Sequence, residues 1–322
     1  NIGYSYKTNY TPKLCKLIDA KGGYAEVVSE MEYDLAIKLG VNPEMIIVNG
    51  PYKTKQALEK FLLGGSIVNL DSYAEVELLK TIVQSHFDKK FSIGLRCNFE
   101  INNASISRFG FDVESDNFGA MFSEISNIDN VVINGIHCHF PNRDLESYSY
   151  RVDKILELAQ RLFSTPPKYI DIGGGFFGKM KGSLKAQFST PTVEYGAYAN
   201  LIATKFSQFY QDYSDENKPI LLLEPGSAIV ADTMYFVAKV IDLKEVRGRK
   251  IATSSGSKFN MGLLTSTISM PMDVYSKDDT RLQHKKIDVV GFTCIEDDCL
   301  YKGYNGKMGV GDYLVFSNVG SY

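Results

Sequence analysis

Tryptophan is absent from this sequence of 322 residues, and histidine and cysteine are scarce, with four and five copies. An odd number of cysteines without a C-x-x-C pair disfavours both a disulfide scaffold and a structural zinc site. We therefore expect a protein of a reducing, cytoplasmic environment that holds no metal ion. The cysteines are Cys15, Cys97, Cys138, Cys294 and Cys299.

An excess of positive charge is also lacking, because 35 Lys and Arg residues face 38 Asp and Glu residues, for a net charge of −3. Without a basic field to attract phosphates, we expect no nucleic-acid partner. Apolar stretches such as Pro219–Leu223 and Ala228–Ala231 are far too short to cross a bilayer, so we expect no membrane span. The start, Asn1–Tyr4, shows no signal-peptide pattern.

Eight short apolar or β-branched runs are spaced through the first two thirds of the sequence and predict strands. Between them, residues 73–87, 148–163 and 195–213 place their apolar side chains on one face of a helix. This alternation predicts an α/β fold, a closed (β/α)8 TIM barrel over residues 1–232. The predicted strands are Ile2–Tyr6, Tyr24–Ser29, Met45–Asn49, Ser66–Leu70, Phe91–Asn98, Val131–His139, Lys168–Ile172 and Pro219–Glu224.

The alternation ends after about residue 230. Strand-like runs follow at Tyr235–Val246, Ile287–Val290 and Tyr313–Asn318, without amphipathic helices between them. Turn residues separate them, as in Arg247–Arg249 and Asn305–Lys307. We therefore expect a smaller β-rich domain over residues 233–322, and leave open whether the sequence contains all of it.

The barrel predicts where chemistry takes place, because active sites in such barrels lie at the carboxyl ends of the strands. Lys7 ends the first strand, where its amine is either a nucleophile in the barrel mouth or a surface lysine. His137 and His139 share one face of a predicted strand. Their imidazoles are zinc ligands, ordinary core residues or a flat surface that stacks on a cofactor, and the sequence leaves these three alternatives open. Glu224 ends an apolar run and needs a cation, either a protonated ring nitrogen or a barrel cation such as Arg96.

Three consecutive glycines, Gly173–Gly175, follow the seventh predicted strand. Consecutive glycines let backbone N–H groups approach a phosphate closely, although a plain tight turn has the same composition. The spacing also satisfies the dinucleotide pattern G-x-G-x-x-G. Residues 179–191 are polar and contain Gly182 and Pro191, so they lack the helix that this pattern requires. The run therefore favours a phosphate loop over a nicotinamide-dinucleotide site.

The β-rich part contains a thiol in an acidic setting, because Cys294 is followed closely by Glu296, Asp297 and Asp298. Such a loop can transfer protons beside a substrate. A solvated turn is the alternative.

Taken in order, these pieces resemble the pyridoxal-phosphate decarboxylases with an alanine-racemase-like barrel (fold type III), the group of diaminopimelate, ornithine and arginine decarboxylases. The resemblance covers nearly the whole chain. The segments that carry it are Tyr6–Asn9, Leu95–Asn98 with Arg108–Gly110, Gly135–His139, Gly173–Phe176, Glu224–Gly226, Gly291–Cys294 and Gly320–Tyr322.

The resemblance implies pyridoxal 5'-phosphate as cofactor and an amino acid as substrate. By this likeness Lys7 forms the Schiff base with the cofactor, His139 stacks on its ring and Glu224 holds the ring nitrogen. Cys294 reaches the site of the neighbouring subunit as a catalytic group, with Glu296 beside the substrate, which implies a homodimer with composite active sites. By the same likeness, the cofactor phosphate would be held by Gly173, Gly174, Gly175 and Tyr322, and Gly226 would be a further cofactor-binding residue.

Departures from the family pattern indicate a substrate other than diaminopimelate. Ser227 stands where the family usually has an arginine after Glu-Pro-Gly, and residues 262–275 contain no second arginine. The family's His-Ile-Gly-Ser becomes His139–Asn142, and Ile295 replaces the acid that usually follows the cysteine. We therefore expect α-decarboxylation of another amino acid.

Two alternatives remain open. An amino-acid racemase on the same fold typically places an arginine at the ring nitrogen, and Glu224 argues against it. A non-catalytic protein that resembles a decarboxylase would keep the fold without the turnover.

Overall fold

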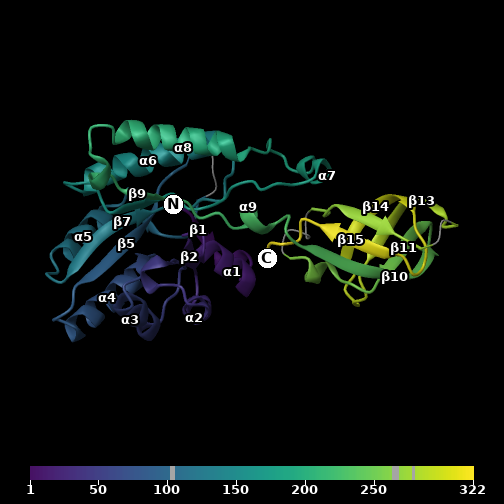
Figure 1. Cartoon of the computed structure of the whole chain (residues 1–322), viewed down its shortest axis with the longest axis horizontal. Coiled ribbons are helices and arrows are strands. Elements are labelled where there is room, and N and C mark those ends of the chain that lie inside the picture. Colours follow the sequence, from purple (N-terminus) through teal and green to yellow (C-terminus); the bar gives the residue numbers. More distant parts are fainter. Residues whose placement is uncertain (102–105, 263–267, 278–279) are drawn as a thin grey trace. The chain divides into compact units, whose positions relative to one another are not determined.

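The computed structural model describes residues 1–101, 106–262, 268–277 and 280–322. The chain divides into two compact units, Asn1–Phe177 with Val193–Gly226, and Gly178–Thr192 with Ser227–Tyr322. Figure 1 labels the elements of both units. This division does not test the domain boundary expected after residue 232, which stays a prediction.

The first unit contains the predicted barrel. Its strands pair in parallel and in chain order. The ring closes between its last and first strands, where Ile2 and Leu223 form a parallel bridge and the Gly3 amide donates to the Leu223 carbonyl at 2.8 Å. The strands of the ring are β1 (Gly3–Ser5), β2 (Tyr24–Val27), β3 (Ile46–Val48), β4 (Ile67–Leu70), β5 (Phe91–Asn98), β7 (Val131–His137), β8 (Tyr169–Asp171) and β9 (Ile220–Leu222). A short strand, β6 (Phe111–Asp112), pairs with β5 outside the ring.

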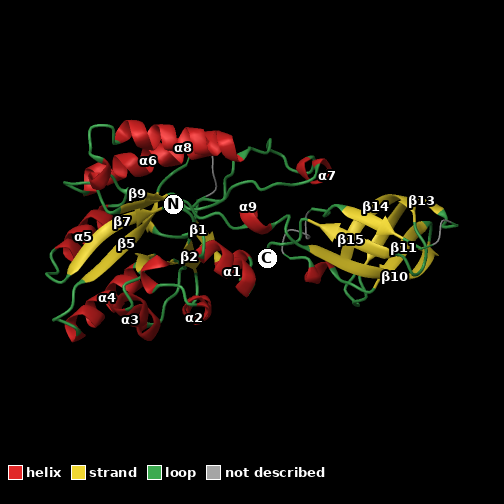
Figure 2. Cartoon of the chain, viewed as in Figure 1, coloured by secondary structure: helices red, strands yellow, loops and turns green. Residues whose placement is uncertain are grey.

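Helices lie outside the strands of the barrel (Figure 2). The three predicted helices are confirmed as α4 (Tyr73–Ser85), α6 (Leu145–Leu162) and α8 (Tyr195–Phe209). The α6 helix begins where the Asp144 carboxylate accepts from the Ser147 amide at 2.8 Å, and it ends shortly before Pro166. The other helices of this unit are α1 (Pro12–Asp19), α2 (Glu30–Leu39), α3 (Lys55–Leu63), α5 (Asp116–Ser126) and the 3-10 turns η1 (Tyr6–Thr8), η2 (Pro43–Met45) and η3 (Asp215–Asn217).

The second unit is built on one mixed sheet of six strands in the order β12-β15-β10-β11-β13-β14. The three predicted strands are present, as β10 (Tyr235–Val246), β13 (Gln283–Val290) and β15 (Tyr313–Ser317). The strands β11 (Arg249–Ser254), β12 (Met272–Tyr275) and β14 (Cys299–Lys307) complete it. Short helical turns are α7 (Gly182–Lys185), α9 (Ser227–Val230) and η4 (Lys258–Asn260). The apolar core includes Val240, Val289, Leu314 and Phe316.

The two turns expected in this unit have different outcomes. Arg247 and Gly248 turn the chain between β10 and β11, both with positive φ, as predicted. The turn expected at Asn305–Lys307 is wrong, because these residues belong to β14. There Gly306 pairs with His284 and Lys307 with Gln283 of β13. Pairing along a long antiparallel ladder outweighs the local turn preference of Asn-Gly.

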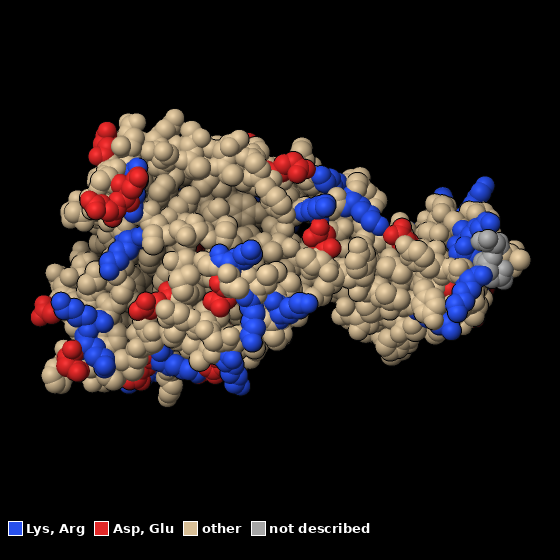
Figure 3. All heavy atoms as spheres, in the orientation of Figure 1, with Lys and Arg blue, Asp and Glu red and all other residues tan. Residues whose placement is uncertain are grey.

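In the described part of the chain, no helix combines the length and the apolar character that crossing a membrane requires. Acidic and basic side chains are interspersed over the face of the first unit seen in Figure 3. This mixture agrees with the near balance of charges in the sequence.

Candidate active site

Lys7 lies in η1, directly after β1, at the carboxyl end of the first barrel strand. Its Nζ atom donates to Oε2 of Glu26 on β2 at 2.9 Å. The Lys7 side chain is 34% exposed, whereas that of Glu26 is fully buried. The Lys7 side chain is therefore partly accessible to solvent, while its amine pairs with a buried carboxylate of the barrel. This agrees with the predicted position of Lys7 at the end of the first strand.

A buried chain of hydrogen bonds connects Lys7 to Glu224. The Asn49 amide group, just after β3, donates to Oε1 of Glu26 at 3.1 Å and to Oε1 of Glu224 at 2.5 Å. Oε2 of Glu224 pairs with Nε2 of His137, on β7, at 3.2 Å. The amine, two carboxylates and an imidazole thus form one network in the barrel, from residues on or just after β1, β2, β7 and β9, with the Asn49 amide joining the two carboxylates.

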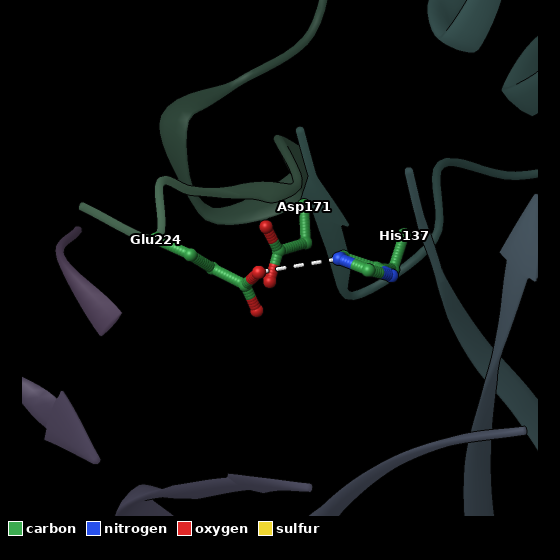
Figure 4. A group of neighbouring side chains, drawn as sticks. All are labelled: His137, Asp171 and Glu224. Atoms are coloured by element: carbon green, nitrogen blue, oxygen red, sulfur yellow. Dashed lines mark hydrogen bonds and ion pairs between the residues drawn. The ribbon is translucent and has the colours of Figure 1, made fainter. Parts of the chain in front are cut away.

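Asp171, the last residue of β8, joins His137 and Glu224 inside the barrel (Figure 4). Its Oδ1 accepts from the Gly173 amide at 2.8 Å, while Oδ2 has no donor among the described residues. Burial and the adjacent Glu224 carboxylate raise the pKa of Asp171 well above its usual range. This shift favours the protonated form of Asp171 beside the Glu224 carboxylate. The ligand atoms of the three residues lie within 4.8 Å of one another.

Glu224 is ionised in spite of its burial. Burial alone disfavours the carboxylate, but the His137 imidazole, followed by the Lys7 charge, holds its pKa below the usual value. The barrel cation considered as its alternative partner, Arg96, pairs with Asp71 instead, at 3.1 Å. That alternative is wrong, because Asp71 follows β4, next to the strand that carries Arg96.

His139 lies beyond the end of β7, next to the glycine run. Its Nδ1 accepts a hydrogen bond from the Gly174 amide at 3.0 Å. Burial, followed by the charge of Lys7, lowers the pKa of His139 well below its usual value. The ring is therefore neutral, with its proton on Nε2. A neutral, flat imidazole held from one edge can serve as a plate against an aromatic ring.

The glycine run forms a crowded cradle after β8. A Cβ atom on Gly173 would lie 2.5 Å from the Cys138 carbonyl oxygen, and one on Gly174 would lie 2.2 Å from that of Glu224. Gly173 and Gly175 have φ of 70° and 92°, which also favours glycine. Gly226 is equally confined, because its Cβ would lie 2.1 Å from Oγ1 of Thr8. Side chains are thus excluded from the loop.

The loop suits a phosphate. Within the described residues, the amide N–H groups of Gly175 and Phe176 have no hydrogen-bond acceptor. Unpaired amides in a glycine-rich bend bind anions. No helix begins at Gly178, and the next helix is the four-residue α7, so the dinucleotide pattern lacks its helix here, as predicted. The cradle, the amine of Lys7 and the buried Glu224 carboxylate together fit a phosphorylated pyridine aldehyde.

Three predicted site residues, Cys294, Glu296 and Tyr322, lie in the second unit. Cys294 and Glu296 are exposed, on a loop that bends around the buried Asp298, which accepts from the Thr293 hydroxyl at 2.6 Å. Tyr322 is 51% exposed. The structure therefore groups Lys7, His139, the glycines and Glu224 in the barrel, and leaves the roles of the other three as predictions.

Sequence reasoning missed Glu26 and Asp171 as members of the site, and it placed Asn49 at a strand end without giving it a role. Glu26 carries a signal that was available, because it is an acid inside the strand Tyr24–Val27. Asn49 ends a predicted strand. Their hydrogen bonds depend on the parallel register, which pairs Glu26 with Ile47. That register becomes visible only in the folded barrel.

The barrel matches a known protein family. Residues 1–231 match the family model described as "Pyridoxal-dependent decarboxylase, pyridoxal binding domain". A diaminopimelate decarboxylase from Aquifex aeolicus is 27% identical over 334 aligned positions, covering 100% of this chain and 76% of that protein.

Solved structures show the same fold with different named substrates. Diaminopimelate decarboxylase from M. jannaschii in complex with L-lysine aligns with a TM-score of 0.85 and 22% identity, covering 100% of this chain and 75% of that one. Arginine decarboxylase from Paramecium bursaria Chlorella virus aligns with a TM-score of 0.81 and 19% identity, covering 100% and 84%. Both consist of this fold, so the fold alone does not select a substrate. The chain belongs to the pyridoxal-dependent decarboxylases, a family of amino-acid carboxy-lyases, and pyridoxal phosphate is its cofactor.

Proposed function

We propose that this protein removes the α-carboxylate of an amino acid other than diaminopimelate, using pyridoxal phosphate attached to Lys7. The observation that carries the proposal is the buried chain of hydrogen bonds from Lys7 through Glu26 and Asn49 to Glu224. It joins the amine of a partly exposed lysine side chain to an ionised, buried carboxylate beside the glycine loop.

Lys7 and Glu224 take the two roles that the chemistry requires. When bound, the cofactor supplies an electron sink for the bond that breaks as CO2 leaves. Nζ of Lys7 would hold the cofactor covalently until the amine of the substrate takes its place. Glu224, ionised and fixed by Asn49 and His137, keeps a proton on the ring nitrogen. An arginine at this place, as in racemases of this fold, would not hold that proton.

His139 and the glycine loop would position the cofactor. The neutral imidazole of His139 offers a flat face and is tied to the loop by the Gly174 amide. The amides of Gly175 and Phe176 would donate to the phosphate, because neither has an acceptor among the described residues, and Gly226 would contribute to cofactor binding. Tyr322 keeps its predicted role as a phosphate contact.

Cys294 would act in the site of a second copy of this chain. The exposed thiol would donate the proton that replaces CO2 on the substrate carbon, and Glu296 would lie beside the substrate. The active form would then be a homodimer in which each site takes residues from both subunits.

The substrate would lack the distal amino-acid head of diaminopimelate. Ser227 replaces one arginine that the family uses for the distal carboxylate. No second arginine occurs in residues 262–275, of which 263–267 lie outside the described residues. The loss of two guanidinium groups removes the charge that a second carboxylate needs.

The test is release of CO2 from a panel of L- and D-amino acids by the protein loaded with pyridoxal phosphate. We expect release from a monocarboxylic or basic amino acid and none from meso-diaminopimelate. Preferred turnover of diaminopimelate would contradict the substrate proposal. Loss of optical activity without CO2 would indicate a racemase, and cofactor binding without either reaction would indicate a non-catalytic protein.

A further inference from the structure

A fully buried arginine on α6, Arg151, contacts both loops that form the cofactor site, and nothing in the catalytic proposal uses it. Its Nη1 donates to the carbonyls of Ile172 and Gly174, at 3.3 and 3.2 Å. Its Nη2 donates to the carbonyls of Phe140 and Asn142, at 3.2 and 3.0 Å. One planar guanidinium therefore bridges the loop after β7 and the glycine loop after β8.

Tyr148, one turn earlier on α6, reinforces this bridge. Its hydroxyl donates to the Gly174 carbonyl at 2.7 Å. Its ring lies under the Arg151 guanidinium, with 4.1 Å between the guanidinium carbon and the ring centroid. The Gly174 carbonyl is therefore held from the α6 side by two donors. Because the C=O and N–H groups of one peptide unit point in opposite directions, this holds the Gly175 amide away from α6.

The charge of Arg151 has no carboxylate partner within ion-pairing distance among the described residues. Its side chain is completely buried, where an uncompensated charge is costly. Neutral carbonyls satisfy four of its N–H bonds but do not neutralise it. An anion in the adjacent loop would supply the missing negative charge.

We propose that Arg151, with Tyr148, is a positioning residue that sets the glycine loop for the phosphate of the cofactor and selects the phosphorylated form. The inference rests on the proposed site of Lys7 and the glycine loop, and it deepens that proposal. Arg151 acts through the backbone and does not touch the reacting atoms. It also fixes the phosphate loop relative to His139, since the two loops that it joins carry Gly174 and His139.

The test compares the dissociation constants of pyridoxal 5'-phosphate and of pyridoxal, measured by equilibrium dialysis of the full chain. Arg151→Met removes both the charge and the hydrogen-bond donors of the guanidinium. Arg151→Lys keeps the charge but loses the planar group that reaches both loops, and Tyr148→Phe removes only the hydroxyl. The control is Arg161→Met on the same helix, because Arg161 donates to the Val113 carbonyl at 3.0 Å, outside the glycine loop. Circular dichroism checks that each variant is folded.

We expect Arg151→Met to weaken binding of the phosphorylated form on the order of 10- to 100-fold, as loss of supporting contacts around a bound group does. The dissociation constant of pyridoxal should rise much less. In Arg151→Lys and Tyr148→Phe, the dissociation constant of the phosphorylated form should rise by a smaller factor. Arg161→Met should leave the ratio of the two constants unchanged. If Arg151→Met does not fold, the two milder variants decide.

An unchanged ratio in all folded variants, with the wild type binding normally, would overturn the role of Arg151 and leave the proposed function standing. Failure of the wild type to bind pyridoxal phosphate at Lys7 would overturn the proposed site, and the role of Arg151 with it.

Discussion

The backbone amide of Gly174 donates to Nδ1 of His139 at 3.0 Å, which ties the glycine loop after β8 directly to the imidazole after β7. The hydrogen bond needs a residue without a side chain at position 174, because the Glu224 carbonyl lies so close. The phosphate cradle and the aromatic plate therefore form one unit and should respond together to substitutions.

Replacing Gly174 by alanine tests this coupling. The added Cβ would lie 2.2 Å from the Glu224 carbonyl oxygen, so the loop must shift. We expect a loss of about 1–3 kcal/mol in the free energy of unfolding, the usual cost of overpacking. Urea unfolding and dialysis with pyridoxal phosphate measure stability and cofactor affinity, and both should fall.

Gly119 on α5 is the matched control, since a Cβ there has nothing within 4 Å. Alanine at this helical position should stabilise the protein by about 0.5–1 kcal/mol and leave cofactor binding unchanged. Equal changes in stability and cofactor affinity at the two glycines would show that the close contacts at position 174 do not matter.

The two buried carboxyl groups should respond differently to amide substitution. Glu224→Gln removes the negative charge that holds the ring proton, and turnover should fall by roughly a hundredfold or more, as when a preorganised charge is lost. Asp171→Asn replaces a neutral acid by a neutral amide that can still donate to Glu224, so its effect should be far smaller. Turnover and bound cofactor are measured on both variants. Equal losses would mean that Asp171 works as a carboxylate.

The stability of the cofactor-free protein should depend on pH through His139. Burial and the charge of Lys7 lower the pKa of His139 in the folded state, so unfolding takes up a proton below the unfolded value of about 6.5. The contribution of neutral His139 to the free energy of unfolding is therefore complete above about pH 6.5 and is lost as the pH falls below it. Thermal unfolding between pH 5 and 8 should therefore show a weaker acid destabilisation in His139→Phe than in the wild type. Parallel curves would mean that folding leaves the pKa of His139 unchanged.

A buried ion pair near the barrel mouth should support the fold. Nζ of Lys53 lies 3.0 Å from Oε2 of Glu75, and both side chains are almost inaccessible, at 2% and 4%. Lys53→Met leaves a buried carboxylate without its cation and should cost about 3–5 kcal/mol. Urea unfolding measures this, and adding Glu75→Leu should restore part of the loss.

Lys60 provides the comparison, because it pairs with Glu30 and Asp34 on the surface. Lys60→Met should change the free energy of unfolding by about 0–1 kcal/mol. A loss at Lys53 no larger than at Lys60 would contradict the view that burial makes the first pair important.

The barrel could be predicted from the sequence because its signal is local and repeated. Each strand is a short apolar run, and helices such as α4 show the spacing of one buried face. The turn expected at Asn305–Lys307 failed because pairing between β13 and β14 is a contact between distant segments. Local propensity does not contain that information.

The site was predictable only where a residue stands out by itself. Lys7 and Glu224 end apolar strands and were found, whereas Glu26 and Asn49 gain their meaning from the hydrogen bonds that join them. Arg151 lies in the middle of a helix and looks like an ordinary surface cation in the sequence. Its burial and its four carbonyl partners are properties of the folded barrel.

Attachment of pyridoxal phosphate to Lys7 is tested most directly by mapping the lysine that carries the cofactor. The full chain is loaded with the cofactor, reduced with borohydride and digested, and the modified peptide is identified by mass spectrometry. Lys53, also at the barrel mouth, is the internal comparison. We expect the cofactor on Lys7 alone, with its visible absorption band absent in Lys7→Ala and retained in Lys60→Met, whose surface ion pairs matter little for stability. Modification of another lysine, or an unchanged band in Lys7→Ala, would contradict it.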